Sequence, residues 1–78
     1  MEKNKSQKLD SMKKLVECWE EKFDRNILDV EVTTDGYLLV TMHKGTQLNS
    51  GELSWLFKNF SEVIVEAEAG YMFLHLFG

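Results

Sequence analysis

The chain has 78 residues, of which 44% are hydrophobic and 28% are charged, and a formal net charge of −4 at pH 7. This length suffices for one small hydrophobic core but not for two domains. The single cysteine, Cys18, excludes an intramolecular disulfide, and no cysteine–histidine cluster indicates zinc, so we expect a cytoplasmic protein without a cofactor. The longest apolar runs, about seven residues, fall short of the roughly 20 that span a bilayer. The lysines of the first ten residues precede no apolar stretch, so we expect no signal peptide.

The charge is unevenly distributed along the chain. Residues 1–14 carry five lysines and two acids, whereas residues 15–78 carry four basic residues and eleven acids. An acidic body repels phosphate backbones, so no direct binding of nucleic acid is expected. We expect residues 1–7 to form a flexible basic arm and residues 8–78 to form a single α+β domain.

Two helices are predicted from apolar residues that recur at spacings of three and four. The first covers residues 8–25, with Asn26 as a left-handed stop. The second begins after Asn49, which can cap it while Glu52 reaches back in a capping box. The expected buried stripes are Leu9, Met12, Val16, Trp19 and Phe23 in the first helix and Leu53, Leu56, Phe57 and Phe60 in the second.

Four strands are predicted from the alternation of apolar and polar residues. The first two flank Asp35-Gly36, a pair typical of a type I′ turn, in which both central residues have positive φ. The last strand, residues 71–77, is apolar on both faces, which favours a central position. The residues expected to face the core are Leu28, Val30 and Val32; Leu38, Val40 and Met42; Val63, Val65 and Ala67; and Met72, Leu74 and Leu76.

The resulting order of elements, α-β-β-α-β-β, predicts an α+β two-layer sandwich with both helices on one face of a four-stranded sheet. Moving the last strand to the front gives βαββαβ, the split βαβ arrangement of ferredoxin-like folds. We therefore expect a permuted ferredoxin-like sheet of strand order 3-4-2-1. This sheet would be mixed, with the second and fourth strands as parallel central neighbours joined through the second helix.

The other face of this sheet would stay open, with an apolar, aromatic centre and the rim residues Asp29, Glu31, Glu62 and Glu66. Such a pattern is typical of a protein interface. We expect a second copy of the chain to cover it as a homodimer. The alternatives are a different protein, burial of the face as core by the first helix or a terminus, and a single strand of RNA, which the acidic rim disfavours. The predicted partner-binding residues are Tyr37, Leu39, His43, Tyr71, Phe73, His75 and Phe77, together with Trp55.

Trp55 is included because it falls roughly opposite the buried stripe of its helix, and tryptophan is enriched at binding hot spots. Packing against the first helix is an equally good explanation of this residue. His43 and His75 could approach one another on adjacent strands, but two imidazoles without a third ligand do not predict a metal site. Cys18 has carboxylates and no base as sequence neighbours, which disfavours a nucleophile.

An acidic ridge on the first helix is the remaining candidate surface. It is either a solvated face or a mimic of nucleic acid that enters a basic channel of another protein. The sequence thus predicts a small acidic, non-enzymatic protein-interaction module with a regulatory role. An inhibitor of a nucleic-acid-handling protein is the alternative, and a small enzyme using His43 and His75 is a weaker third hypothesis. The ridge residues are Asp10, Glu17, Glu21 and Asp24.

Overall fold

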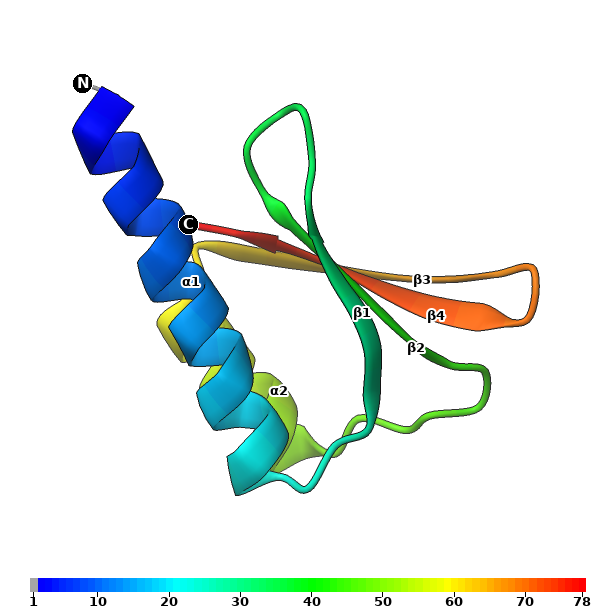
Figure 1. Ribbon diagram of the computed structural model, residues 1–78. Coiled ribbons are helices and arrows are strands. Elements are labelled where there is room, and N and C mark those ends of the chain that lie inside the picture. Colours follow the sequence, from blue (N-terminus) through cyan, green and yellow to red (C-terminus); the bar gives the residue numbers. More distant parts are fainter. Residues whose placement is uncertain (1) are drawn as a thin grey trace.

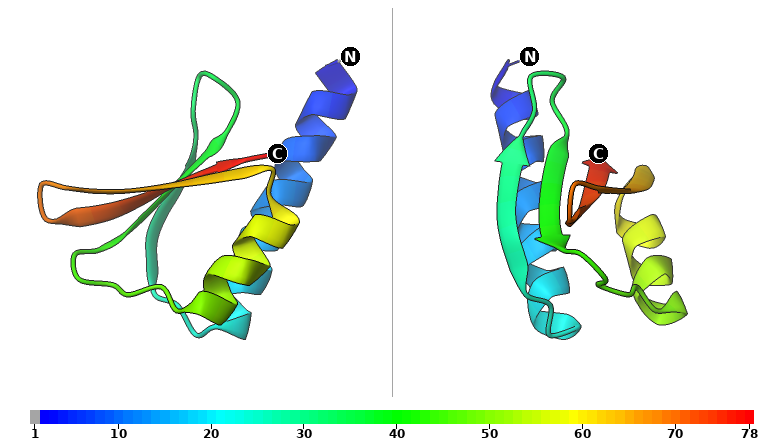
Figure 2. Two further views of the ribbon diagram at one scale, coloured as in Figure 1. Left: turned by 180° about the vertical axis from the view of Figure 1, so that it is seen from behind. Right: turned by 90° about the vertical axis from the view of Figure 1, so that its right-hand side faces the viewer.

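The computed structural model describes the backbone of residues 2–78 and the side chains of residues 8–78. Two helices pack side by side on one face of a four-stranded sheet, and the other face is open (Figure 1; Figure 2). This arrangement confirms the predicted two-layer α+β fold and its order of elements. The elements are α1 (Glu2–Lys22), β1 (Ile27–Val32), β2 (Leu38–His43), α2 (Ser50–Asn59), β3 (Glu62–Glu68) and β4 (Tyr71–Phe77).

The strand order is β1-β2-β4-β3, which is the predicted order read from the opposite edge. All neighbouring strands are antiparallel, so the prediction of a mixed sheet with parallel β2 and β4 is wrong. The crossover through α2 makes β3 parallel to β2, but two strand positions away. Because β4 follows β3 through a hairpin, it is antiparallel to β3 and fills the gap beside β2. The split βαβ arrangement itself is therefore as predicted.

The hydrophobic core lies between the helices and the central strands β2 and β4. The predicted stripe of α1 and the predicted inward-facing residues of both strands are its main components, and Trp19 is fully buried within it. Side chains alternate along each strand, so the residues between the inward-facing ones belong to the open face. The buried apolar residues are Met12, Val16, Trp19, Leu38, Val40, Met42, Leu56, Phe60, Met72, Leu74 and Leu76.

The outer strands contribute less to the core than predicted. A bulge between Ile27 and Asp29 changes the register of β1. As a result, Ile27 packs against the core in the place predicted for Leu28, which is exposed. Val30 and Val65 pair with buried residues of the central strands and share their face, yet both are exposed. The helices thus cover the middle of the sheet and leave its outer strands partly uncovered.

The first helix starts earlier than predicted. Its backbone is helical from Glu2, whereas the sequence predicted a start at residue 8 and a basic arm over residues 1–7. The side chains of residues 2–7, and residue 1 as a whole, lie outside the described part of the chain.

The end of α1 is set by a left-handed residue two positions before the predicted stop at Asn26. Asp24 has a φ of 52°, a conformation that aspartate tolerates better than most residues. The backbone N–H of Arg25 then donates to the carbonyl of Glu20 at 2.9 Å. This bond belongs to a Schellman motif, which satisfies a carbonyl of the last turn and redirects the chain.

The second helix begins as predicted but is rotated about its axis. Asn49 Oδ1 accepts from the backbone N–H of Glu52 at 2.7 Å, and the Glu52 carboxylate accepts from the backbone N–H of Asn49 at 3.4 Å, which completes the capping box. Glu52 is fully buried, however, whereas Phe57 of the predicted stripe is 59% exposed. Trp55, predicted to lie opposite the stripe, is half-buried against the core. The inward turn of Glu52 brings Trp55 toward α1 and turns Phe57 outward.

The hairpin between β1 and β2 does not use the predicted type I′ turn. Of Asp35 and Gly36, only Gly36 has a positive φ. The backbone N–H of Thr33 donates to the carbonyl of Tyr37, so the loop has three residues, 34–36. A three-residue loop is commonly built from a type I turn followed by a left-handed residue, which Gly36 supplies at little cost.

The type I′ geometry occurs instead in the hairpin between β3 and β4. Ala69 and Gly70 have φ values of 52° and 85°, and they connect the paired residues Glu68 and Tyr71. Alanine adopts the left-handed region at a cost of about 1 kcal/mol, because its Cβ crowds the following carbonyl. This hairpin therefore contains a strained residue at a fully exposed turn.

We expect Ala69→Asn to raise the free energy of unfolding by about 0.5–1 kcal/mol, because asparagine is left-handed at lower cost and Asn-Gly is the favoured type I′ pair. Urea unfolding followed by tryptophan fluorescence measures the change. Ala67→Asn is the matched control in β3, where asparagine is disfavoured and stability should fall slightly. An Ala69→Asn protein no more stable than wild type would contradict this role of the turn.

Candidate functional site

The open face of the sheet brings together seven of the eight predicted partner-binding residues. Leu39 pairs with His75, and His43 pairs with Tyr71, across β2 and β4. Side chains directly opposite each other project from the same face. Trp55 lies on α2, in the other layer. We call the central residues of the open face the aromatic strip: Tyr37, Leu39, Thr41, His43, Tyr71, Phe73, His75 and Phe77.

The aromatic strip is partly exposed along its whole length. Tyr71 is 46% exposed, and Phe73 and Phe77 are half-buried although no helix lies on this face. Their burial comes from one another: the rings of Tyr37 and Phe77 stack at a centroid distance of 4.4 Å, and those of Tyr71 and Phe73 lie 6.3 Å apart. The rings of the strip thus pack against one another in defined positions.

Both outer strands place carboxylates along the sides of the aromatic strip. Glu31 on β1 pairs with Leu39, and on β3 Glu62 pairs with Phe77. The sequence of the four strands contains no lysine or arginine. The open face is therefore apolar in the middle and negative along both edges. We call the exposed acids of its outer strands the edge carboxylates: Asp29, Glu31, Glu62, Glu66 and Glu68.

Glu68 is an addition to the predicted rim. The sequence indicated a loop from residue 68 onward, but β3 continues through Glu68, which pairs with Tyr71. The strand extends this far because the type I′ turn at residues 69–70 is only two residues long. The other four edge carboxylates lie where the alternation of side chains predicted them.

The two histidines of the strip do not come together, so the predicted approach of His43 and His75 is wrong. His43 pairs with Tyr71, four positions along β4 from His75. His75 Nε2 instead lies 2.5 Å from Glu66 Oε1, and its Nδ1 lies 3.4 Å from the Tyr37 hydroxyl. A carboxylate can only accept, so Nε2 carries the proton in this pair. These contacts orient His75 within the strip.

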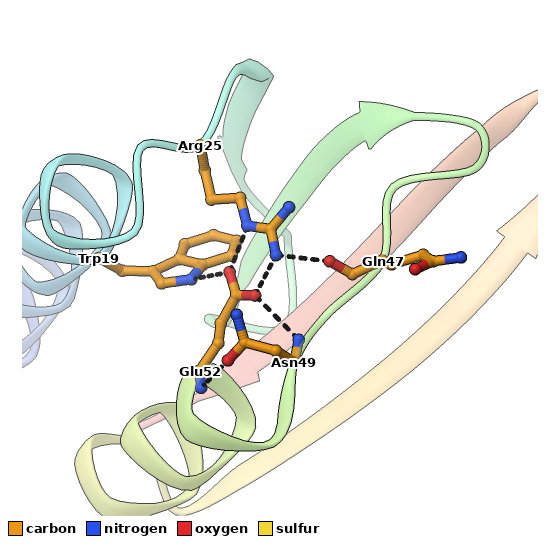
Figure 3. A network of polar contacts seen from close by, with 5 residues as sticks. All are labelled: Trp19, Arg25, Gln47, Asn49 and Glu52. Carbon is orange, nitrogen blue, oxygen red and sulfur yellow. Dashed lines mark hydrogen bonds and ion pairs between the residues drawn. The ribbon is translucent and has the colours of Figure 1, made fainter.

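A buried polar cluster links the two helices on the opposite side of the sheet (Figure 3). The carboxylate of Glu52, fully buried, accepts from Trp19 Nε1 and from Arg25 Nε, each at 2.6 Å. Arg25 Nη2 makes a second contact with the carboxylate and donates to the carbonyl of Gln47 at 2.5 Å. Together with the backbone N–H of Asn49, these donors satisfy both oxygens of Glu52. The cluster joins the end of α1 to the start of α2.

Arg25 is charged at every pH at which the protein is ordinarily handled, and the ion pair with Glu52 favours its charged form further. The hydrogen bond to Glu52 raises the pKa of the Arg25 guanidinium above its ordinary value, against an opposing effect of desolvation. Folding therefore raises the pKa of this cation. Such a cation stabilises the folded state at every pH below its ordinary pKa, and this contribution disappears only as the pH rises through the raised value. The contribution of Arg25 is therefore constant across neutral pH.

Sequence reasoning identified Glu52 only as a capping residue and did not pair it with Arg25. One available signal was the arginine itself, because Arg25 is the only arginine among nine basic residues. A planar guanidinium forms two-pronged contacts with carboxylates that lysine cannot make. The structure uses this property, with Nε and Nη2 on different oxygens of Glu52.

Trp55 and Cys18 lie near each other on the outer side of the helix layer. Trp55 packs edge-on against Phe23, which directly follows α1, with ring centroids 6.3 Å apart. This contact is the packing explanation considered for Trp55 from the sequence. Cys18 is exposed and lines a hollow of about 510 Å³ with Glu21, Lys22 and Trp55. No histidine lines this hollow, so it supplies Cys18 with no imidazole base.

The acidic ridge of α1 is exposed but interrupted. Asp10, Glu17 and Glu21 lie on the helix, and Asp24 lies just past its end. Lys14 follows Asp10 by four positions and precedes Glu17 by three, which places it between them on the same face of the helix. Its charge divides the ridge, whereas no lysine or arginine occurs in the strands that carry the edge carboxylates.

We expect Arg25→Met to lower the free energy of unfolding by about 3 kcal/mol, because it leaves the buried Glu52 without its cation. Adding Glu52→Met should restore about 2 kcal/mol of that loss, since the apolar pair leaves no unpaired charge. Urea unfolding of the wild type, both single variants and the double variant measures this coupling.

Full additivity of the two single losses would contradict a coupled pair. If Arg25→Met alone does not fold, a folded double variant establishes the same coupling. Lys22→Met is the matched control, because it removes a cation from an exposed position one turn earlier and should change stability by no more than about 0.5 kcal/mol.

The described residues hold no group of three or more histidine, cysteine, aspartate or glutamate side chains placed to bind a metal ion. No helix within residues 2–78 combines the length and apolar character needed to cross a membrane. A scan against protein-family models and searches of curated proteins and of solved structures find no match to this chain.

Proposed function

We propose that this chain is a non-enzymatic protein-binding module and that the open face of its sheet is the binding surface. The observation that supports this proposal is the aromatic strip, a partly exposed and largely apolar surface two strands wide with acids along both of its sides. Protein interfaces have this anatomy, with an apolar centre depleted of charge and a polar rim. As part of the same proposal, the single cysteine favours the cytoplasm.

The alternative that α1 buries this face as core does not apply. Both helices lie on the opposite face, and no described segment of residues 2–78 crosses the open one (Figure 2). The aromatic side chains nevertheless remain partly exposed, which costs free energy in water and is unusual for a monomer. A partner that covers the strip would recover this free energy.

A binding role accounts for the polar groups better than a catalytic one. The buried carboxylate of Glu52 is fully engaged by its donors, so it has no lone pair left for a substrate. His75 holds Glu66 on an exposed sheet surface, and His43 lies at a distance from both. General acid–base catalysis needs such groups to converge on one substrate atom.

A different protein is a better partner for the open face than a second copy of the chain. A face-to-face homodimer would bring two sets of five edge carboxylates to one interface, and the strands supply only His43 and His75 to oppose them. Like charges in an interface cost several kcal/mol. The homodimer expected from the sequence stays a prediction, and the edge carboxylates count against it. Charge mimicry by the ridge of α1 is weaker still, because Lys14 interrupts that ridge.

To test the binding surface, we would select peptides from a random display library on the wild-type protein. We expect the selected peptides to bind Phe73→Asp at least about tenfold more weakly, because the substitution places a charge at the centre of the strip. Titration calorimetry with synthetic peptides measures the dissociation constants.

Phe57→Asp is the matched control, since Phe57 is an exposed phenylalanine on the other layer. It introduces the same charge and should leave binding unchanged. Circular dichroism confirms that both variants fold. Peptides that bind all three proteins equally, or that lose binding only to Phe57→Asp, would contradict the open face as the binding surface.

A further inference from the structure

We infer that the partner of the open face is a cationic amphipathic helix of another protein, with an apolar stripe flanked on both sides by lysine or arginine. This inference rests on the proposed function and names the chemistry of the partner. It follows from the arrangement of charge and apolar surface on the four strands.

The charge of the partner follows from the edge carboxylates. They lie on both sides of the aromatic strip, and Glu66 alone among them contacts a basic side chain, that of His75. Glu31 and Glu62 are exposed and lie on opposite outer strands. A partner that covers the strip brings its own flanking residues over these acids. Cations at those positions gain Coulomb energy and speed association, whereas neutral or acidic residues do not.

The shape of the partner follows from the width of the face. Neighbouring strands are about 4.8 Å apart, so β1 and β3 are separated by roughly 14 Å. An α-helix is about 10–12 Å across with its side chains, and long basic side chains extend beyond that. A helix above β2 and β4 therefore reaches both rows of carboxylates at once. The seven residues of β4 span roughly 20 Å, which matches a helix of about 14 residues.

An extended peptide fits this face less well than a helix. Its side chains alternate between facing the sheet and facing away, so it offers no flanking positions beside an apolar row. An amphipathic helix presents an apolar stripe with polar residues along both of its borders. Between an extended peptide and a helix, only the helix matches an apolar strip with acids on two sides.

The grouped rings of the aromatic strip suit an apolar helix stripe. Tyr37 and Phe77 form one aromatic group, and Tyr71 with Phe73 forms another farther along β4. Leu39 and Thr41 lie beside them on β2 and are less bulky than the rings. Leucines of the helix have apolar surface to contact along the whole length of the strip, and lysines near the ring faces add cation–π attraction.

The probe for this inference is a synthetic helical peptide of about 14 leucines and lysines, with leucine on one face and lysine along both borders. Two matched peptides carry glutamine or glutamate in place of lysine. We expect wild type to bind the lysine peptide at least about tenfold more tightly than the glutamine peptide, and the glutamate peptide most weakly. Raising the salt concentration should weaken binding of the lysine peptide, strengthen binding of the glutamate peptide and leave the glutamine peptide nearly unchanged.

The variant Glu31→Lys/Glu62→Lys reverses one charge on each edge. We expect it to weaken binding of the lysine peptide at least about tenfold and to strengthen binding of the glutamate peptide. A loss of structure alone would weaken both peptides and so could not produce this exchange of preference. The matched control is Glu17→Lys/Glu21→Lys on α1, which makes the same change of charge on the other layer and should leave both affinities close to wild type.

The outcomes separate this inference from the proposed function. In one outcome, Phe73→Asp abolishes binding of the peptides, but Glu31→Lys/Glu62→Lys leaves the ranking of the peptide affinities unchanged. The open face then binds a partner without selecting cations, and the inference is wrong. If Glu17→Lys/Glu21→Lys is the only variant that no longer binds the lysine peptide, the acidic ridge is the binding site and both proposals fail. A wild-type dimer in light scattering that Phe73→Asp dissociates would make a second copy the occupant of the face, and would also overturn the inference.

Discussion

The position of both helices depends on the buried carboxylate of Glu52. A charge in an apolar interior is stable only when a counter-charge and hydrogen-bond donors surround it. Here the donors come from the last turn of α1, from the residue after its left-handed stop and from the cap of α2. The Schellman motif at Asp24 is what turns Arg25 back toward α2. The start of α2 is also favourable for an anion, because the helix dipole is positive at that end.

This cluster has consequences for every surface of the domain. Turning Glu52 inward brings Trp55 against Phe23 and turns Phe57 to solvent. Both helices pack their apolar residues on the inward-facing residues of β2 and β4, so the opposite face receives no cover from the described chain. The aromatic strip is exposed for this reason, although its side chains are as bulky as those of the core. The edge carboxylates flank that exposed surface and also discourage pairing of the free strand edges with other chains.

The parts of the fold that local patterns control were predictable. The stripe of α1, the alternation of β2 and β4, the capping box at Asn49 and the strand order all follow from spacings within single elements and from ordinary connections. The composition of the open face follows from the same alternation, and only Glu68 was missing from its rim. The prediction that β2 and β4 are parallel was wrong, because a parallel crossover need not join adjacent strands. The predictions for the two hairpin turns were wrong, because the turn type depends on the loop length and the loop length depends on the strand register.

The sequence by itself determined the binary pattern of each element, and with it the set of residues that share the open face and the charges at its edges. These are properties of residues two, three or four positions apart, and backbone geometry converts them directly into faces. The tertiary structure alone decided the rotation of α2, the bulge that packs Ile27 against the core in the place predicted for Leu28, and the pairing of Arg25 with Glu52. Each of these depends on residues far apart in the chain, because a buried charge can be satisfied only by whatever neighbours the completed fold brings to it.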